Sequence, residues 1–243
     1  KAAGVDISVV LPVATAQRQV EHINDRAAEI NRRFTASGKR GLLSFGCMHP
    51  DYEGWREELG RIKDLGILGI KIHPVYQGRD LTDSRYLRIL DRAGELGLIV
   101  VTHAGLDVGF PGIERCSPKM ARRAIEQVGP VKLILAHMGG WRSWEQVMEE
   151  LPGTKVRIDT SFSVGEMSQR EGEEYYSPDE LRLLDEARFM EMVAAFGAQR
   201  VFFGSDSPWS GQGESRRWIE ALPLSQAEQG LILGGNAKKL LGL

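Results

Sequence analysis

The sequence predicts an α/β fold, a distorted (β/α)8 TIM barrel, and three observations support this class. Seven short apolar runs recur along the 243 residues. Most of them lack the alternating polar positions of a half-exposed strand, which is typical of parallel strands covered on both faces. Segments with helix-start signals separate the runs. Several runs end in a histidine or an aspartate, and the carboxyl ends of barrel strands share one face, where active sites form.

The expected strands follow one another at intervals that leave room for a helix between most neighbours. They span residues 5–13, 42–47, 68–73, 98–103, 132–137, 156–161 and 200–205. A helix within residues 15–34 is predicted by apolar side chains at steps of three or four residues, the stripe of a helix packed on the outside of a sheet: Val20, Ile23, Ala27, Ile30 and Phe34. Further helix starts are predicted by a serine before a proline and by three capping boxes, beginning at Ser117, Ser143, Ser177 and Ser225.

The number of strands is one short of a closed barrel. Such a barrel has eight strands, and seven runs are visible. The first run follows Lys1 almost at once, so we expect the missing βα unit to precede it. A degenerate seven-stranded or open arrangement is the alternative. No low-complexity linker divides the chain, and we interpret residues 1–243 as a single domain.

The composition indicates which kinds of partner the protein can bind and in which cellular compartment we expect it. The 31 basic and 33 acidic residues nearly cancel and are scattered, so no basic surface for nucleic acid is expected. No apolar run approaches the roughly 20 residues that span a bilayer, and no secretory signal opens the chain. Cys47 and Cys116 are too few for a disulfide framework. We therefore expect a cytoplasmic protein with no membrane partner and two inert thiols.

Polar side chains at the strand ends are the candidate site. His73, His103 and His137 end three of the runs, and Asp206 ends a fourth. Imidazoles and a carboxylate from distant parts of a barrel can meet around a metal ion. Lys71 lies two residues before His73 and therefore on the same face of its strand. If that face points inward, both side chains are expected to contact substrate.

Two further residues are weaker candidates for the substrate site. The guanidinium of Arg115 could pair with a substrate carboxylate, and a solvated loop arginine is the alternative. Trp141 follows the Gly139-Gly140 turn and could line a pocket, although a core position is equally consistent with the sequence.

Short motifs along nearly the whole chain resemble one enzyme family. They are Gly69-Ile70-Lys71-Ile72-His73-Pro74 with Gln77, Thr102-His103-Ala104-Gly105, Leu135-Ala136-His137-Met138-Gly139-Gly140, Ile158-Asp159-Thr160-Ser161, Gly204-Ser205-Asp206 and Leu233-Gly234-Gly235-Asn236-Ala237. In this order they resemble the amidohydrolase-related metal-dependent TIM-barrel hydrolases. More narrowly, they resemble the branch that includes the aminocarboxymuconate-semialdehyde and resorcylate decarboxylases.

The resemblance implies roles for three residues. It implies a metal ligand at His103, a catalytic imidazole at His137, and a carboxylate at Asp206 that serves the metal and catalysis. It also implies a His-x-His pair on the first strand, and no such pair occurs in these 243 residues. We expect that pair upstream of Lys1. The implied cofactor is a divalent metal, with Zn²⁺ as the first expectation and Mn²⁺ as an alternative.

The sequence thus predicts a metal-dependent hydrolase acting on a small carboxylate-bearing or lactone-like substrate. In this mechanism Asp206 deprotonates metal-activated water, and the metal and His137 stabilise the developing oxyanion. One alternative keeps the site and changes the reaction to decarboxylation or hydration of an unsaturated acid. Another is a catalytically inactive barrel used for binding. The sequence leaves open whether the protein is a homodimer.

Overall fold

The computed structural model describes residues 3–165 and 183–243 of the chain. It divides into two compact units, which are described separately: an N-terminal unit, Asp6–Val156, and a C-terminal unit, Arg157–Leu243 with Lys1–Val5. Strands and helices alternate in both units, and the strand pairs described below are parallel. This agrees with the predicted α/β class.

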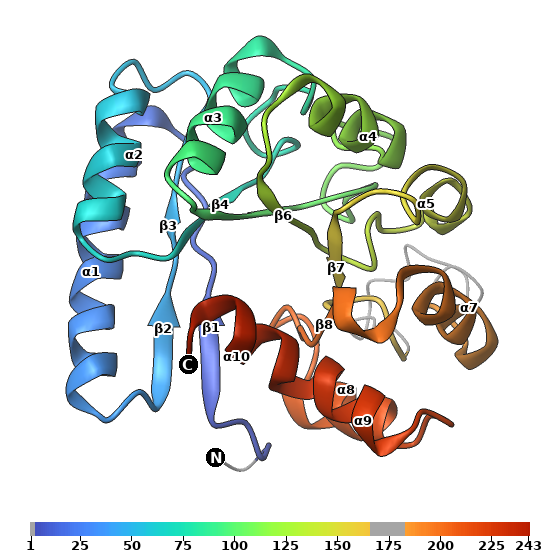
Figure 1. Cartoon of the computed structure of the whole chain (residues 1–243). Coiled ribbons are helices and arrows are strands. Elements are labelled where there is room, and N and C mark those ends of the chain that lie inside the picture. The colour runs from blue at the N-terminus through green and yellow to red at the C-terminus, as the bar shows by residue number, and fades with distance from the viewer. Residues whose placement is uncertain (1–2, 166–182) are drawn as a thin grey trace, which may run out of the picture. The chain divides into compact units, whose positions relative to one another are not determined.

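The N-terminal unit contains a pair of strands and a four-stranded row. β1 (Ile7–Val10) pairs with β2 (Gly41–Ser44), and α1 (Val20–Ala36), after the 3₁₀ turn Gln17–Gln19, connects them (Figure 1). The row is β3 (Gly46–Cys47), β4 (Gly69–Ile72), β5 (Ile99–Thr102) and β6 (Lys132–Leu135), paired in that order. Helices follow these strands in turn: α2 (Trp55–Asp64), α3 (Ser84–Glu95), α4 (Pro118–Gln127) and α5 (Trp144–Glu150).

The C-terminal unit continues the same alternation. β7 (Arg157–Asp159) pairs with β8 (Val201–Phe202), and α7 (Glu186–Phe196) with the 3₁₀ turn Ala198–Arg200 precedes β8. The end of the chain is helical: α8 (Gln212–Glu220), α9 (Gln226–Gly230), the π-turn Leu231–Gly235 and α10 (Asn236–Leu241).

The strands β4 and β5 form the centre of the core. Every residue of both strands is buried, including Lys71 and Thr102. This confirms the expectation that the apolar runs are covered on both faces. The helix α3 buries one face, whose residues recur at helical spacing: Tyr86, Ile89, Leu90 and Ala93.

Each of the seven predicted strand regions contains a strand, but residues 42–47 contain two. Two asparagines of α1 interrupt this run. The Asn31 side chain accepts a hydrogen bond from Ser44 N–H at 2.7 Å and donates to Ser44 O at 2.9 Å. Asn24 does the same for Cys47, at 2.8 and 3.3 Å. Because these asparagine side chains form hydrogen bonds with the backbone of the run, it divides into two strands. β2 pairs with β1, and β3 pairs with β4.

The predicted helix starts have different outcomes. The Ser117 hydroxyl accepts from Met120 N–H, and Ser225 forms a complete capping box with Glu228, so both predictions are confirmed. The capping box at Ser143 is wrong, because that hydroxyl donates to Glu114 Oε1 at 2.5 Å instead, although α5 does begin at the next residue. The box at Ser177 lies outside the described residues.

The two cysteines match the expectation of inert thiols. Cys47 and Cys116 are buried and unpaired with each other, and burial raises the pKa of each thiol to about 12, so both are inert at neutral pH. Within the described ranges, the helices are too short or too polar to cross a bilayer.

Candidate metal centre

Three histidines converge where β4, β5 and β6 end. His73 and His103 directly follow β4 and β5, and His137 comes two residues after β6. All three are buried. The rings of His73 and His103 stack with their centroids 4.2 Å apart and their planes 13° apart. His103 Nδ1 lies 3.0 Å from His137 Nε2, a hydrogen-bond distance. The three strand ends therefore form one imidazole cluster.

The backbone after β5 and β6 is shaped by close approach of two loops. Gly105 (φ +83°) forms a bridge with Trp141, and a Cβ at Gly105 would lie 2.2 Å from Trp141 N. Only glycine allows this approach. His137 itself has a φ of 60°, a left-handed conformation that costs a non-glycine residue about 1–2 kcal/mol. Strained positions of this kind gather at functional sites.

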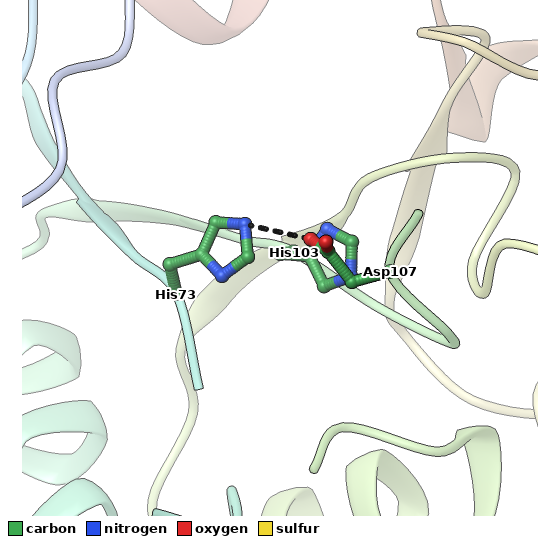
Figure 2. A group of neighbouring side chains, drawn as sticks. All are labelled: His73, His103 and Asp107. Atoms are coloured by element: carbon green, nitrogen blue, oxygen red, sulfur yellow. Dashed lines mark ion pairs between the residues drawn. The ribbon is translucent and has the colours of Figure 1, made fainter. Parts of the chain in front are cut away.

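A fourth side chain, Asp107, completes the cluster. Asp107 Oδ2 lies 3.6 Å from His73 Nε2 and 3.8 Å from His103 Nε2. Figure 2 shows the carboxylate turned toward the two imidazoles. Its other oxygen, Oδ1, accepts a hydrogen bond from Gly109 N–H at 2.8 Å. The loop backbone thus fixes which oxygen faces the histidines.

Both stacked histidines are held in the neutral state. Burial, followed by the positive charge of Lys71 and by His137, lowers the pKa of His73 to about 2. Burial is also the largest cause that lowers the pKa of His103 well below its usual range, followed by His137, His73 and Lys71. A neutral imidazole offers a nitrogen lone pair, which is the form that binds a metal.

The donor set suits a divalent cation. One ligand atom from each of His73, His103 and Asp107 can be chosen so that all three lie within 4.8 Å of one another, and all three residues are buried. Two neutral imidazoles and a carboxylate are a common ligand combination for Zn²⁺ and also serve other first-row metals. The chemistry of the cluster therefore fits the metal dependence expected from the sequence.

The other predicted site residues lie in different surroundings. Lys71, on β4, is buried near the histidines whose pKa values it lowers. Arg115 is half-exposed and its guanidinium donates to Asp80 Oδ1 at 2.9 Å. Trp141 is buried, with its backbone bonded to Ala104 and Leu106. Asp206 belongs to the C-terminal unit, where it is exposed in the turn after β8, and its convergence with His103 stays a prediction.

Sequence reasoning missed two residues of this region. Asp107 lies four positions after His103, in the loop beyond the strand end at which ligands were expected. A carboxylate this close behind a strand-end histidine was the available signal. Gln77 was noted only within a motif, yet its buried side chain bonds His73 N–H, Ala14 O and Met48 O.

Comparisons with known proteins agree on the family. The family model described as amidohydrolase matches residues 2–243. A 2-amino-3-carboxymuconate-6-semialdehyde decarboxylase of Dictyostelium discoideum is 28% identical over 249 residues, which is 94% of this chain. The chain spans 66% of the length of that curated relative.

Two solved structures share the fold at low sequence identity. The 2,6-dihydroxybenzoate decarboxylase from Rhizobium is 18% identical with a TM-score of 0.67, covering 99% of this chain and 85% of that one. The 5-carboxyvanillate decarboxylase of Novosphingobium aromaticivorans, solved with manganese and 4-hydroxy-3-methoxy-5-nitrobenzoic acid, is 17% identical with a TM-score of 0.71, covering 100% and 78%. These matches confirm the predicted TIM-barrel class.

Proposed function

The chain belongs to the amidohydrolase family, and from this we propose that it is a metal-dependent decarboxylase of a small carboxylic acid. The curated relative and the two structural neighbours are named as decarboxylases, which supports the second of our expectations over hydrolysis. The proposed partner is a small-molecule acid.

One observation carries the proposal: a buried group of imidazoles lies beside a buried lysine. His73, His103 and His137 form the group, and the charge of Lys71 acts on the first two. A lysine ammonium in such a setting attracts a substrate carboxylate, because a charge interacts more strongly where water is excluded. We propose that Lys71 helps to bind the carboxylate that is lost.

The cation belongs at the same strand ends. We propose His103 as a ligand, with His73 and Asp107 as the further donors within its reach. When bound, a divalent cation supplies Lewis-acid polarisation of a substrate oxygen. Asp206 keeps the role in catalysis that the family pattern implies, and Arg115 and Trp141 remain proposed contacts of the substrate.

Decarboxylation also needs a proton carrier. The carboxylate leaves as CO2, the electrons of the broken carbon–carbon bond stay on the substrate carbon, and that carbon takes up one proton. We propose that His137 delivers this proton. Its Nε2 lies 3.0 Å from His103 Nδ1, so the ring is held within the cluster at the strand ends. Proton transfer by a positioned histidine contributes about 10²–10⁴ in rate.

The test measures CO2 release. The purified protein, loaded with Mn²⁺ or Zn²⁺, is incubated with 2,6-dihydroxybenzoate, 5-carboxyvanillate and 2-amino-3-carboxymuconate-6-semialdehyde, and separately with lactones and carboxylate esters. We expect CO2 from at least one acid and, in D2O, one deuterium at the carbon that lost the carboxylate. The variant His137→Gln should lose about 10²–10⁴ in rate, whereas His22→Gln, at an exposed position, should not.

The outcome separates the three functions considered for this chain. Hydrolysis of a lactone or ester without CO2 release would favour the hydrolase. A folded, metal-loaded protein that turns over none of these compounds would favour a binding role. Retention of the full rate in His137→Gln would remove that residue from the mechanism.

A further inference from the structure

We propose that a shallow hollow next to the imidazole cluster binds a second carboxylate of the substrate through Arg18 and His49, which makes the substrate a dicarboxylic acid. The inference rests on the proposed decarboxylation and adds to it the class of acid. Arg18 lies in the 3₁₀ turn after β1, and His49 lies two residues after β3. Neither residue belongs to the imidazole cluster.

The lining of the hollow favours a small anion. The hollow has a volume of about 420 Å³ and opens to solvent. Residues of the N-terminal unit line it: Thr15, Ala16, Gln17, Arg18 and His49. One of these side chains is cationic and none is acidic. A small group with negative charge is therefore the ligand that suits this lining.

His49 supplies a buried hydrogen-bond donor. The residue is only 6% exposed, and its Nδ1 accepts a hydrogen bond from Asp51 N–H at 3.1 Å. Burial lowers the pKa of His49, so at neutral pH the ring is mostly neutral and carries its proton on Nε2. Within residues 3–165 and 183–243, no group forms a hydrogen bond with Nε2. This N–H therefore needs an acceptor from the hollow.

Arg18 supplies a positive charge at the rim. Its side chain is exposed, and in the part of the chain that the structure describes no carboxylate pairs with it. A guanidinium presents parallel N–H groups that match the two oxygens of a carboxylate. Asp51, which acts on His49, is itself paired with Arg85 at 2.7 Å and with Arg79 at 3.4 Å. Because those arginines compensate its charge, Asp51 does not exclude an anion from the hollow.

The loop that carries Arg18 is shaped before a ligand arrives. Gln19 Oε1 accepts hydrogen bonds from Thr15 N–H at 2.9 Å, from Ala16 N–H at 3.0 Å and from the Thr15 hydroxyl at 3.2 Å. These bonds hold the turn, so little conformational entropy is lost when an anion binds. Since the Thr15 hydroxyl already donates to Gln19, we assign the carboxylate to Arg18 and His49.

Gln77 connects the hollow to the imidazole cluster. Its Nε2 donates to the backbone of both lining loops, at Ala14 O and Met48 O, both at 2.8 Å. Its Oε1 accepts from His73 N–H at 3.0 Å. One side chain therefore bridges the lining loops and the end of β4. A substrate whose first carboxylate lies at Lys71 can reach the hollow with a second one.

The experiment measures binding to the full chain by isothermal titration calorimetry in the presence of Mn²⁺. The probes are benzene-1,3-dicarboxylate, benzene-1,4-dicarboxylate and hexanedioate, each compared with its monocarboxylate, benzoate or hexanoate. In the wild type we expect at least one dicarboxylate to bind about tenfold or more tightly than its monocarboxylate. In Arg18→Gln this preference should fall to within about threefold, with the affinity for the monocarboxylate unchanged.

Two substitutions of His49 separate its donor from its packing. His49→Asn keeps an acceptor near the position of Nδ1, for Asp51 N–H, and removes the donor at Nε2, so the preference should fall as in Arg18→Gln. His49→Gln keeps a donor near the position of Nε2 and should retain most of the preference. The controls Arg32→Gln and His22→Gln alter exposed residues of the same types on α1 and should bind as the wild type does.

Three results would overturn the proposal. They are a wild type that binds no dicarboxylate more tightly than its monocarboxylate, a preference that survives in Arg18→Gln, and inorganic phosphate bound more tightly than every dicarboxylate. Arg18 is exposed, so its variant tests the proposal even where a variant of the buried His49 fails to fold. Because calorimetry needs no turnover, a preference that depends on Arg18 without any release of CO2 would contradict the proposed reaction and leave the carboxylate site standing.

Discussion

Gln77 offers the sharpest test of how the strand ends are held in place. Its buried side chain makes four hydrogen bonds within the N-terminal unit. Oε1 accepts from His73 N–H at 3.0 Å and from the Tyr86 hydroxyl at 2.7 Å. Nε2 donates to Ala14 O and to Met48 O, both at 2.8 Å. One amide therefore joins the chain segments that follow β1, β3 and β4 to α3.

The expected destabilisation follows from these four bonds. Each buried hydrogen bond contributes about 1 kcal/mol net, and a buried polar group left without a partner costs about 1–3 kcal/mol. Water entering the space left by Gln77→Ala would satisfy some of the groups, so we expect a loss of about 3–5 kcal/mol in the free energy of unfolding. Tyr86→Phe removes one of the four bonds and should cost about 1 kcal/mol.

A second substitution tests the direction of the bonds. In Gln77→Glu the carboxylate cannot donate to Ala14 O and Met48 O, so two carbonyls would face a negative charge. We expect this variant to be at least as unstable as Gln77→Ala at neutral pH, and to recover stability at lower pH, where a protonated carboxyl can donate one bond.

Urea unfolding followed by circular dichroism measures these differences. Gln127→Ala is the matched control, because that side chain is exposed and donates to the backbone of its own helix, at Arg123 O. It should change stability by less than about 0.5 kcal/mol. A loss below about 1 kcal/mol in Gln77→Ala would refute the idea that this amide secures the strand ends.

Three other perturbations have defined outcomes. Gly105→Ala should lower the free energy of unfolding by about 3 kcal/mol or more, because its Cβ would lie 2.2 Å from Trp141 N. The control Gly112→Ala, at a similar φ with open space around it, should lower it by about 1 kcal/mol in the same urea assay. Equal losses in the two variants would contradict this reasoning. Cys47 and Cys116 should not react with a thiol reagent at pH 8 until the protein is denatured, when both react; modification of the native protein would contradict their burial. In the metal-free protein, His73 has a folded pKa far below its unfolded value of about 6.5, so its contribution to stability is present above that pH and is lost as the pH falls. This should remove about 2 kcal/mol between pH 7 and pH 5, less in His73→Gln, and an unchanged pH dependence in the variant would refute the reasoning.

The parts of the fold that could be predicted from the sequence are those that depend on local patterns. Apolar runs without polar alternation marked β4, β5 and β6, since burial on both faces leaves that pattern in the residues themselves. The break between β2 and β3 could not be predicted, because it depends on Asn24 and Asn31 of another element reaching the strand backbone. Ser143 failed as a cap for the same reason: Glu114, distant in sequence, takes its hydroxyl.

The same distinction applies to the site. The topology of parallel strands was enough to bring His73, His103 and His137 together, since residues at the carboxyl ends of neighbouring strands are neighbours in space. Asp107 depends on loop conformation. Its position requires the positive φ of Gly105 and the hydrogen bonds of that loop to Trp141, none of which leaves a periodic signal in the sequence.

Burial has opposite consequences for the stability of this cluster and for its chemistry. An exposed histidine with a pKa of about 6.5 is roughly one-quarter protonated at pH 7, and a metal must displace that proton to bind. The buried His73 and His103 carry no such proton, so protons do not compete with an ion at neutral pH. On acidification the folded state loses stability, because the unfolded chain binds protons that the buried histidines of the folded cluster do not bind. We therefore expect acid to release a bound ion mainly by unfolding the N-terminal unit, with the loss of circular dichroism and the loss of metal following the same pH curve. Metal lost at a pH where the fold is intact would mean that the imidazoles are more accessible to protons than their burial implies.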